Sequence, residues 1–139
     1  MAIEYALKIA TPEKIERVSL LAKSQLRPGN GINDCEVFDE RPTGSSIILD
    51  AFGFAPTAVI FAHVRKSHVD EGEDTIARIF NSALSNLAGD AVLLYNYEVV
   101  VALRRKGDLV LNARLEFWNE RRLRMITLPY VLEPLKDLT

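Results

Sequence analysis

DEGEDTIARIFNSALSNLAGDAVLLYNYEVVVALRRKGDLVLN, residues 70–112, contains the two clearest secondary-structure patterns in the chain, a helix and then three strands. Apolar residues recur at steps of three and four from Ile76 to Leu87, which is the spacing of one face of an amphipathic helix. Acidic residues at positions 70–74 favour the positive end of a helix dipole and therefore indicate its N-terminus. Gly89 is expected to end the helix as a left-handed residue.

The second half of this stretch predicts a meander of three strands. Residues 91–95 are apolar at almost every position, which indicates a strand covered on both faces. Residues 98–105 and 109–117 alternate between apolar and polar side chains, as half-buried strands do. The expected turns are Asn96-Tyr97 and Lys106-Gly107-Asp108, and connections this short join antiparallel neighbours.

The residues before this stretch predict a strand, a helix and three further strands. Residues 3–10 alternate as a half-buried strand does, and Thr11 is the expected N-cap of a helix that runs to about Leu26. Short turns separate the three strands that follow, which are therefore expected to be antiparallel neighbours. These strands are predicted at residues 34–40, 45–54 and 57–66.

The element order is therefore βαβββαβββ with a C-terminal tail, and it predicts an α+β fold. We expect a mostly antiparallel sheet with the two helices packed on one face. Residues 125–128 fit either a last strand or a short docked segment. The chain has 139 residues, the size of one domain, and it shows no linker or repeat, so residues 1–139 are expected to form a single globular domain.

Composition and charge limit the classes of function. The net charge is −2, but residues 1–99 carry −5 and residues 100–139 carry +3. Nucleic-acid binding is not expected, because it usually needs a concentrated basic surface. The start has no signal-peptide pattern, no apolar run approaches the ~20 residues of a membrane span, and Cys35 is the single cysteine. We therefore expect a cytoplasmic protein that does not bind membranes.

The sequence does not contain a pattern that predicts catalysis or cofactor binding. A metal site at His63 and His68 would need a third ligand such as Asp70, yet strand alternation places His63 on a face and His68 in the following loop. Cys35 lies between two acids, which raise a thiol pKa, so we expect a small buried strand residue rather than a nucleophile. We expect no catalytic residue, no metal and no cofactor.

One strand carries the most specific candidate for a contact surface. Strand alternation places Asp34, Glu36, Phe38 and Glu40 on one face of residues 34–40. An aromatic side chain among acids could anchor a basic protein, with the charges speeding encounter and the ring supplying buried area. The simpler interpretation is a solvated edge strand, on which acids prevent aggregation.

A set of short stretches along the chain shares a pattern with one known family: Ala2-Ile3-Glu4-Tyr5, Phe52-Gly53-Phe54-Ala55-Pro56-Thr57, Gly89-Asp90-Ala91-Val92-Leu93-Leu94, Glu98-Val99-Val100, Leu103-Arg104-Arg105, Gly107 and Leu109-Val110-Leu111-Asn112. In these stretches the chain resembles the Sit-type immunity proteins of the toxin-exchange systems of myxobacteria and their relatives. The resemblance covers most of the chain and implies a cytoplasmic protein that binds a cognate toxin and neutralises it, without catalytic or cofactor residues. It does not indicate which residues face the toxin.

Three hypotheses remain open at this point. The first is an immunity-type inhibitor of a toxin, and the second is a general interaction module or homo-oligomer that pairs through an edge strand such as residues 34–40. The third, a small enzyme or ligand carrier, requires a deep pocket with convergent polar groups. The aromatic residues that could line such a pocket, or could equally form the core, are Phe52, Phe54, Phe61 and Trp118.

Overall fold

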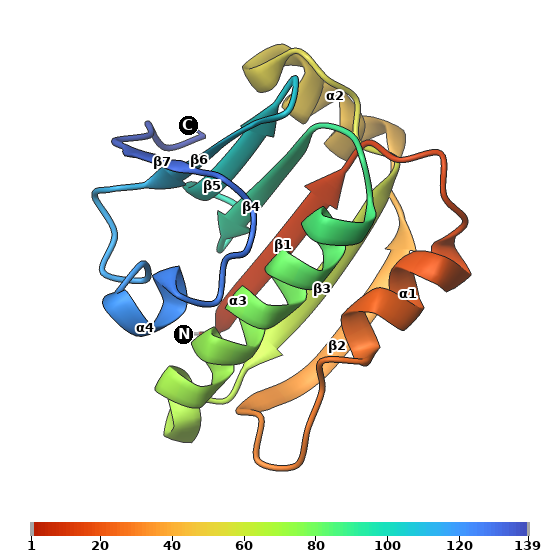
Figure 1. Ribbon diagram of the computed structural model, residues 1–139. Coiled ribbons are helices and arrows are strands. Elements are labelled where there is room, and N and C mark those ends of the chain that lie inside the picture. The colour runs from red at the N-terminus through yellow and green to blue at the C-terminus, as the bar shows by residue number, and fades with distance from the viewer. Residues whose placement is uncertain (1, 139) are drawn as a thin grey trace.

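The computed structural model describes residues 2–138, which form a seven-stranded sheet with helices against both of its faces (Figure 1). The strand order is β2-β3-β1-β4-β5-β6-β7, and every neighbouring pair is antiparallel except β6 and β7. The predicted α+β class and mostly antiparallel sheet are therefore confirmed. The elements are β1 Ile3–Ile9, α1 Ile15–Lys23, β2 Ile32–Asp39, α2 Pro42–Phe52, β3 Ala58–Val64, the 3₁₀ turn η1 Lys66–His68, α3 Val69–Asn86, β4 Ala91–Tyr95, β5 Val99–Arg105, β6 Asp108–Asn112, α4 Glu120–Leu123 and β7 Val131–Glu133.

Alternate side chains of the inner strand β1 point to the two faces of the sheet. Tyr5, Leu7 and Ile9 are buried on the face that α1 and α3 cover. The apolar stripe of α3, which includes Ile76 and Phe80, packs into the same core. The prediction that two helices pack on one face is correct for α1 and α3, because each has a single apolar stripe that must be buried.

The opposite face is covered over only part of the sheet. Ile48 of α2 and Phe54 after it pack on Val92, Leu94 and Val100 in a second, smaller apolar cluster. Leu135 and Leu138 from the C-terminal end pack against the same cluster. The cover lies over β4 and β5, and Ala6, Lys8 and Val59 of β1 and β3 are also buried on this face. The rest of the face, formed by β2 and by the part of β1 and β3 around Glu4 and His63, is only partly covered.

The predicted strand at residues 45–54 is wrong, because these residues belong to helix α2. Pro42 lies at the start of the helix, where its missing N–H costs nothing, and Gly53 ends the helix in the left-handed conformation with φ +79°. Isoleucine and leucine at positions 47–49 suggested a strand, but only Ile48 is buried. The observed order therefore has α2 between β2 and β3. These two strands pair directly and antiparallel, whereas the prediction paired each of them with residues 45–54.

The predicted strand at residues 109–117 is too long, because β6 ends at Asn112. The Asn112 side chain is fully buried, where its amide group donates to the Val100 carbonyl and its oxygen accepts from the Arg114 N–H. These bonds turn the chain out of the sheet. The last strand is β7, three residues long, rather than residues 125–128.

The two helices that the sequence predicts, α1 and α3, have ends that differ from the prediction. Helix α1 begins at Ile15, and the Thr11 hydroxyl accepts from the Glu13 N–H in the turn before it. Helix α3 ends at Asn86 without using Gly89 as its cap. The buried guanidinium of Arg104 caps this end instead, by donating to the carbonyls of Leu84, Leu87 and Gly89 at 2.6–2.8 Å.

Two glycines let the loop before β2 cross the start of α3 at very close range. A Cβ on Gly72 would lie 2.5 Å from Val64 Cγ1 and 2.7 Å from the Gly31 carbonyl oxygen. A Cβ on Gly31 would lie 2.3 Å from the Gly72 nitrogen, and Gly31 also has a left-handed backbone with φ +72°. The crossing therefore fixes where β2 joins the sheet relative to α3.

Candidate functional site

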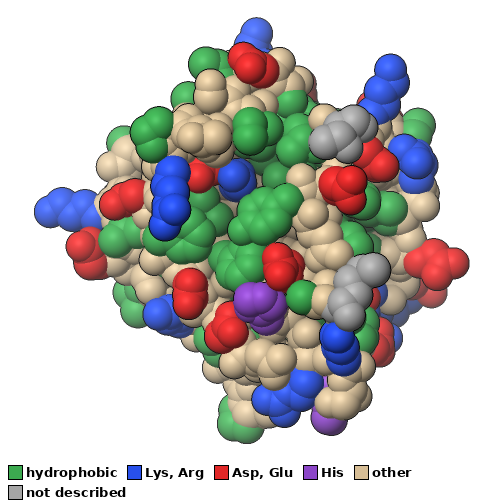
Figure 2. Space-filling view, turned by 180° about the vertical axis from the view of Figure 1, so that it is seen from behind, with side chains coloured by type: hydrophobic (Ala, Val, Ile, Leu, Met, Phe, Trp, Pro, Cys, Tyr) green, Lys and Arg blue, Asp and Glu red, His purple; other side chains and the backbone are tan. Residues whose placement is uncertain are grey.

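The open part of the sheet places side chains from three strands side by side. The register aligns Asp34 with His63 and His63 with Glu4, and it aligns Glu36 with Phe61. Figure 2 looks onto this face and shows hydrophobic side chains at its centre, with a histidine and several acidic side chains beside them. We call the face formed by Glu4, Asp34, Glu36, Phe38, Phe61, His63 and Tyr97 the open face.

The four residues predicted from the sequence as a contact surface differ in their accessibility. Asp34 and Glu36 are exposed, and Phe38 is half-buried beside them. Glu40 follows β2, but its carboxylate pairs with Lys8 Nζ at 2.6 Å and its side chain is only 5% exposed. Glu40 is therefore held in an ion pair with β1 and is not accessible to a partner. Asp34, Glu36 and Phe38 are the predicted residues that a partner could reach.

His63 lies between two carboxylates that come from strands on either side of it. Its Nδ1 is 2.9 Å from Asp34 Oδ1, and its Nε2 is 3.3 Å from Glu4 Oε1. The hydrogen bond to Asp34 raises the pKa of His63 above the ordinary 6.5, partial burial opposes this rise, and the charges of Asp34 and Glu4 add to it. Protonation of His63 would neutralise part of the negative charge on the open face.

The Asp34→Asn variant is expected to lower the pKa of His63 towards 6.5, because it removes the strongest cause of the rise. The folded-state pKa lies above the unfolded value. This interaction therefore stabilises the fold fully below about pH 6.5, and its contribution is lost as the pH rises through the folded-state pKa. Titration of the imidazole protons by NMR measures the pKa of His63 in the native protein and in the variant. Equal pKa values in the two proteins would show that Asp34 does not stabilise the protonated form of His63.

The aromatic side chains of the open face pack on one another. The rings of Phe61 and Tyr97 stack with their centroids 5.9 Å apart, and the His63 ring meets Phe61 edge-on at 4.9 Å. Tyr97 is 42% exposed and comes from the turn after β4, where it has a left-handed backbone with φ +60°. A tyrosine held in this way offers a rigid apolar surface with a polar tip, which suits a protein contact.

Cys35 points to the other side of β2, away from the open face. It is partly buried beside α1, and burial raises the pKa of its thiol, with the charges of Asp34 and Glu36 adding to the rise and Lys23 opposing it. Such a thiol is a weak nucleophile. Among the residues that the structure describes, no three His, Cys, Asp or Glu side chains gather in a way that could hold a metal ion.

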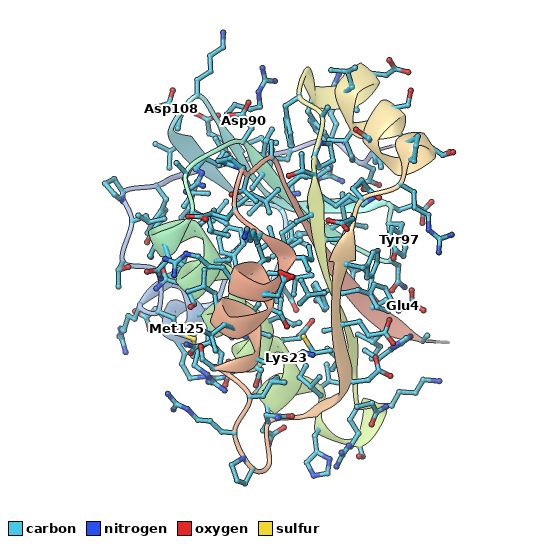
Figure 3. The ribbon with its side chains drawn as sticks, turned by 90° about the vertical axis from the view of Figure 1, so that its right-hand side faces the viewer. Glu4, Lys23, Asp90, Tyr97, Asp108 and Met125 are labelled. Atoms are coloured by element: carbon cyan, nitrogen blue, oxygen red, sulfur yellow. The ribbon has the colours of Figure 1, made fainter. Side chains whose placement is uncertain are left out.

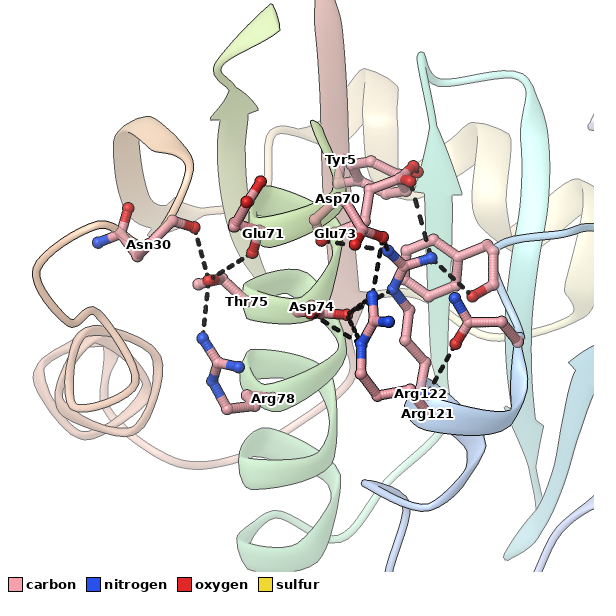
Figure 4. Close-up of polar contacts among 12 residues, drawn as sticks. Tyr5, Asn30, Asp70, Glu71, Glu73, Asp74, Thr75, Arg78, Arg121 and Arg122 are labelled. Atoms are coloured by element: carbon pink, nitrogen blue, oxygen red, sulfur yellow. Dashed lines mark hydrogen bonds and ion pairs between the residues drawn. The ribbon is translucent and has the colours of Figure 1, made fainter. Parts of the chain in front are cut away.

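A second polar cluster joins α3 to α4 on the helix-covered side of the sheet (Figure 4). The Arg122 side chain is only 3% exposed and donates to Asp70 at 2.6 Å, to Asp74 at 2.9 Å and to the Phe117 carbonyl at 3.1 Å. Arg121 binds the same two aspartates from the surface, with a side chain that is 50% exposed. The cluster holds α4 against α3.

The buried hydroxyl of Tyr5 donates to Glu73 next to this cluster. Burial raises the pKa of Tyr5, and the hydrogen bond to Glu73 and its charge add to the rise. The two residues lie in the wall of a hollow between α3 and residues 114–117, which is lined mainly by apolar side chains. The Tyr5 hydroxyl is therefore a neutral donor that fixes α3 on the sheet.

The four aromatic residues suggested as a pocket lining lie in three separate places and share no cavity. Phe52 and Phe54 pack together in the smaller apolar cluster, and Phe61 lies on the open face. Trp118 is buried in the main core, where its ring N–H donates to the Val101 carbonyl at 2.8 Å. A ligand pocket built from these four residues is therefore ruled out.

Comparison with known families shows that a family model described as SitI3-like matches residues 3–122. The chain belongs to the SitI3-like family. This agrees at the family level with the resemblance to Sit-type immunity proteins noted from the sequence. No curated protein and no solved structure matches the chain. None of the helices in residues 2–138 has the length and apolar character that a membrane span requires.

The SitI3-like match spans β1 to β6 and ends at Arg122, so it contains every residue of the open face. The predicted contact surface contains Asp34, Glu36 and Phe38 of this face but lacks Glu4, Phe61, His63 and Tyr97. Phe61 and His63 were candidates only for a pocket and for a metal site. Glu4 lies on the polar side of an alternating strand, which was a usable signal. Its place beside His63 depends on the strand order, which alternation does not encode.

Proposed function

We propose that this SitI3-like chain is a non-catalytic immunity protein that binds a cognate toxin in the cytoplasm and neutralises it through the open face. The observation that carries the proposal is an uncovered part of a sheet on which stacked aromatic rings are surrounded by acids. The rings supply area that a partner can bury, and the acids select a basic surface and speed encounter. The family assignment supports the immunity role, and its name suggests the class of partner.

Co-expression tests the proposed function directly. The chain is produced in a bacterial host together with the toxic domain that the proposal expects to be encoded beside its gene. Growth should be rescued by the chain, and the two proteins should elute together from a sizing column. Continued growth arrest without a complex would rule out the immunity role for this pair.

Substitutions on the open face are expected to weaken the complex. Glu36→Lys reverses a charge, and Phe38→Ala removes apolar area, so each should raise the dissociation constant at least about tenfold. The matched control is Leu20→Ala, which removes a side chain that is 68% exposed on α1, on the covered side of the sheet. Isothermal titration calorimetry measures all three variants. If Leu20→Ala lowered the affinity while Glu36→Lys and Phe38→Ala did not, the toxin would bind the helix-covered side of the sheet rather than the open face.

A further inference from the structure

Strand β2 is an edge of the sheet with a free row of backbone groups. Within residues 2–138 it pairs only with β3, and Figure 3 looks onto this edge, with β2 facing the viewer. Glu4 and Tyr97 project on one side of it, while α1 and Lys23 lie on the other. An edge that is eight residues long can accept a further strand.

The pairing pattern shows which backbone groups of β2 point outwards. The Glu40 N–H donates to the Thr57 carbonyl at 2.9 Å, so residues of even number in this stretch direct their backbone groups to β3. The N–H and C=O groups of Cys35, Val37 and Asp39 therefore point away from the sheet. The side chains of Asp34 and Glu36 rise from the same strand on to the open face.

The charges of β2 select the kind of strand that fits. Residues 32–39 contain three acids, Asp34, Glu36 and Asp39, and no basic residue. In an antiparallel pair of two copies centred on Cys35, Asp34 would lie opposite Glu36 of the second copy. Centring on Glu36 opposes two glutamates, whereas centring on Val37 opposes Asp34 to Glu40, whose charge Lys8 compensates. Two of the three registers therefore place like charges directly opposite one another. Like charges directly opposite one another destabilise a strand pair, so β2 disfavours its own copy.

We infer that β2 binds an extended segment of a partner protein in which basic and apolar residues alternate. The basic side chains of the added strand lie over Asp34 and Glu36, and the apolar side chains lie on the other side beside Cys35 and Val37. Main-chain hydrogen bonds to the edge supply affinity, and the alternation supplies specificity. The inference deepens the proposed function by naming the chemistry of the toxin segment, and it is testable without the toxin.

A model peptide tests the edge directly. The probe is a capped octapeptide of alternating lysine and valine, with a glutamate–valine peptide as its matched control. Hydrogen exchange measured by NMR should show slower exchange of the Cys35, Val37 and Asp39 amides with the lysine peptide at saturation. The amides of Glu36 and Phe38, already bonded to β3, should change little. No protection, or equal protection by both peptides, would overturn the inference.

Charge reversal supplies a second, independent readout. The Asp34→Lys/Glu36→Lys double variant should bind the glutamate–valine peptide and lose the lysine–valine peptide, because the selecting charges have changed sign. An unchanged preference would overturn the role given to these acids. Light scattering on the chain alone should show a monomer, and a dimer abolished by the double variant would overturn the choice of a basic partner over a second copy.

A backbone variant separates the edge from the open face. Cys35→Pro removes an outward N–H without disturbing the bonds to β3, and Cys35→Ala removes the thiol but keeps that N–H. With the toxic domain, Cys35→Pro should weaken binding at least about tenfold and Cys35→Ala should not. Equal binding by both variants would overturn the inference while leaving toxin neutralisation intact. A protein that binds the peptide but fails to rescue growth would instead retain the inference and lose the proposed function.

Discussion

Replacing Arg122 with alanine is expected to lower the free energy of unfolding by about 3–5 kcal/mol, the usual cost of removing one partner from a buried charge cluster. The Arg122 side chain is 3% exposed and is shared by Asp70, Asp74 and the Phe117 carbonyl. Alanine leaves the Asp74 carboxylate, which is 18% exposed, without its inner partner. The guanidinium also lies 5.2 Å from the centre of the Phe117 ring, and that contact is lost too.

Arg121→Ala is the matched control, because Arg121 binds the same two aspartates from the surface. Its effect should be far smaller, since water replaces an exposed ion pair and salt screens it. Urea denaturation of the native chain and the two variants measures the difference. If both arginine variants lost the same amount of unfolding free energy, the burial of Arg122 would not determine the strength of the cluster.

Replacing Gly72 with alanine is expected to lower the free energy of unfolding by about 1–3 kcal/mol, as extra atoms do in a tightly packed site. In an open helix the same change would raise stability by up to about 1 kcal/mol, because alanine has the higher helix propensity. Here the added methyl group would lie 2.7 Å from the Gly31 carbonyl oxygen and 2.5 Å from Val64 Cγ1. The backbone of the loop cannot move away without pulling β2 from β3.

Gly29→Ala is the control, because Gly29 has a left-handed backbone with φ +70° but open space around it. It should cost about 1 kcal/mol through backbone strain alone. Thermal unfolding followed by circular dichroism compares the two variants with the native chain. A higher melting temperature for Gly72→Ala would contradict the close crossing of the loop and α3.

Much of the fold follows from local patterns, since α3 and the strands β4 and β5 were predicted close to their true limits. The error at α2 arose because residues 45–49, with isoleucine and leucine in sequence, have strand-like propensity. The stronger signals were Pro42 and Gly53 at the two ends of the helix. Residues 109–117 alternate throughout, yet the buried contacts of Asn112 end β6 early, and such long-range contacts leave no local pattern.

For the candidate site, the sequence predicts which residues share a face of one strand, but it does not predict which strands lie side by side. The alternation of residues 34–40 correctly placed Asp34, Glu36 and Phe38 on one face. Glu40 also lies on that side, but its ion pair with Lys8 depends on β1, which is separated from β2 by β3. The Arg122 cluster joins residues 48 and 52 positions apart in the chain, and only the folded sheet brings them together.

The position of β1 inside the sheet, between β3 and β4, affects when the chain can fold during its synthesis. Tyr5 pairs with Ala62 on one side and with Tyr95 on the other, so the first strand made waits for β4 before both of its edges are satisfied. Pairings this distant in sequence slow folding, because the loop must close before the contact stabilises it. A nascent chain that has not yet passed residue 95 therefore presents an unpaired apolar strand edge to its surroundings, which is a site of aggregation until β4 is made.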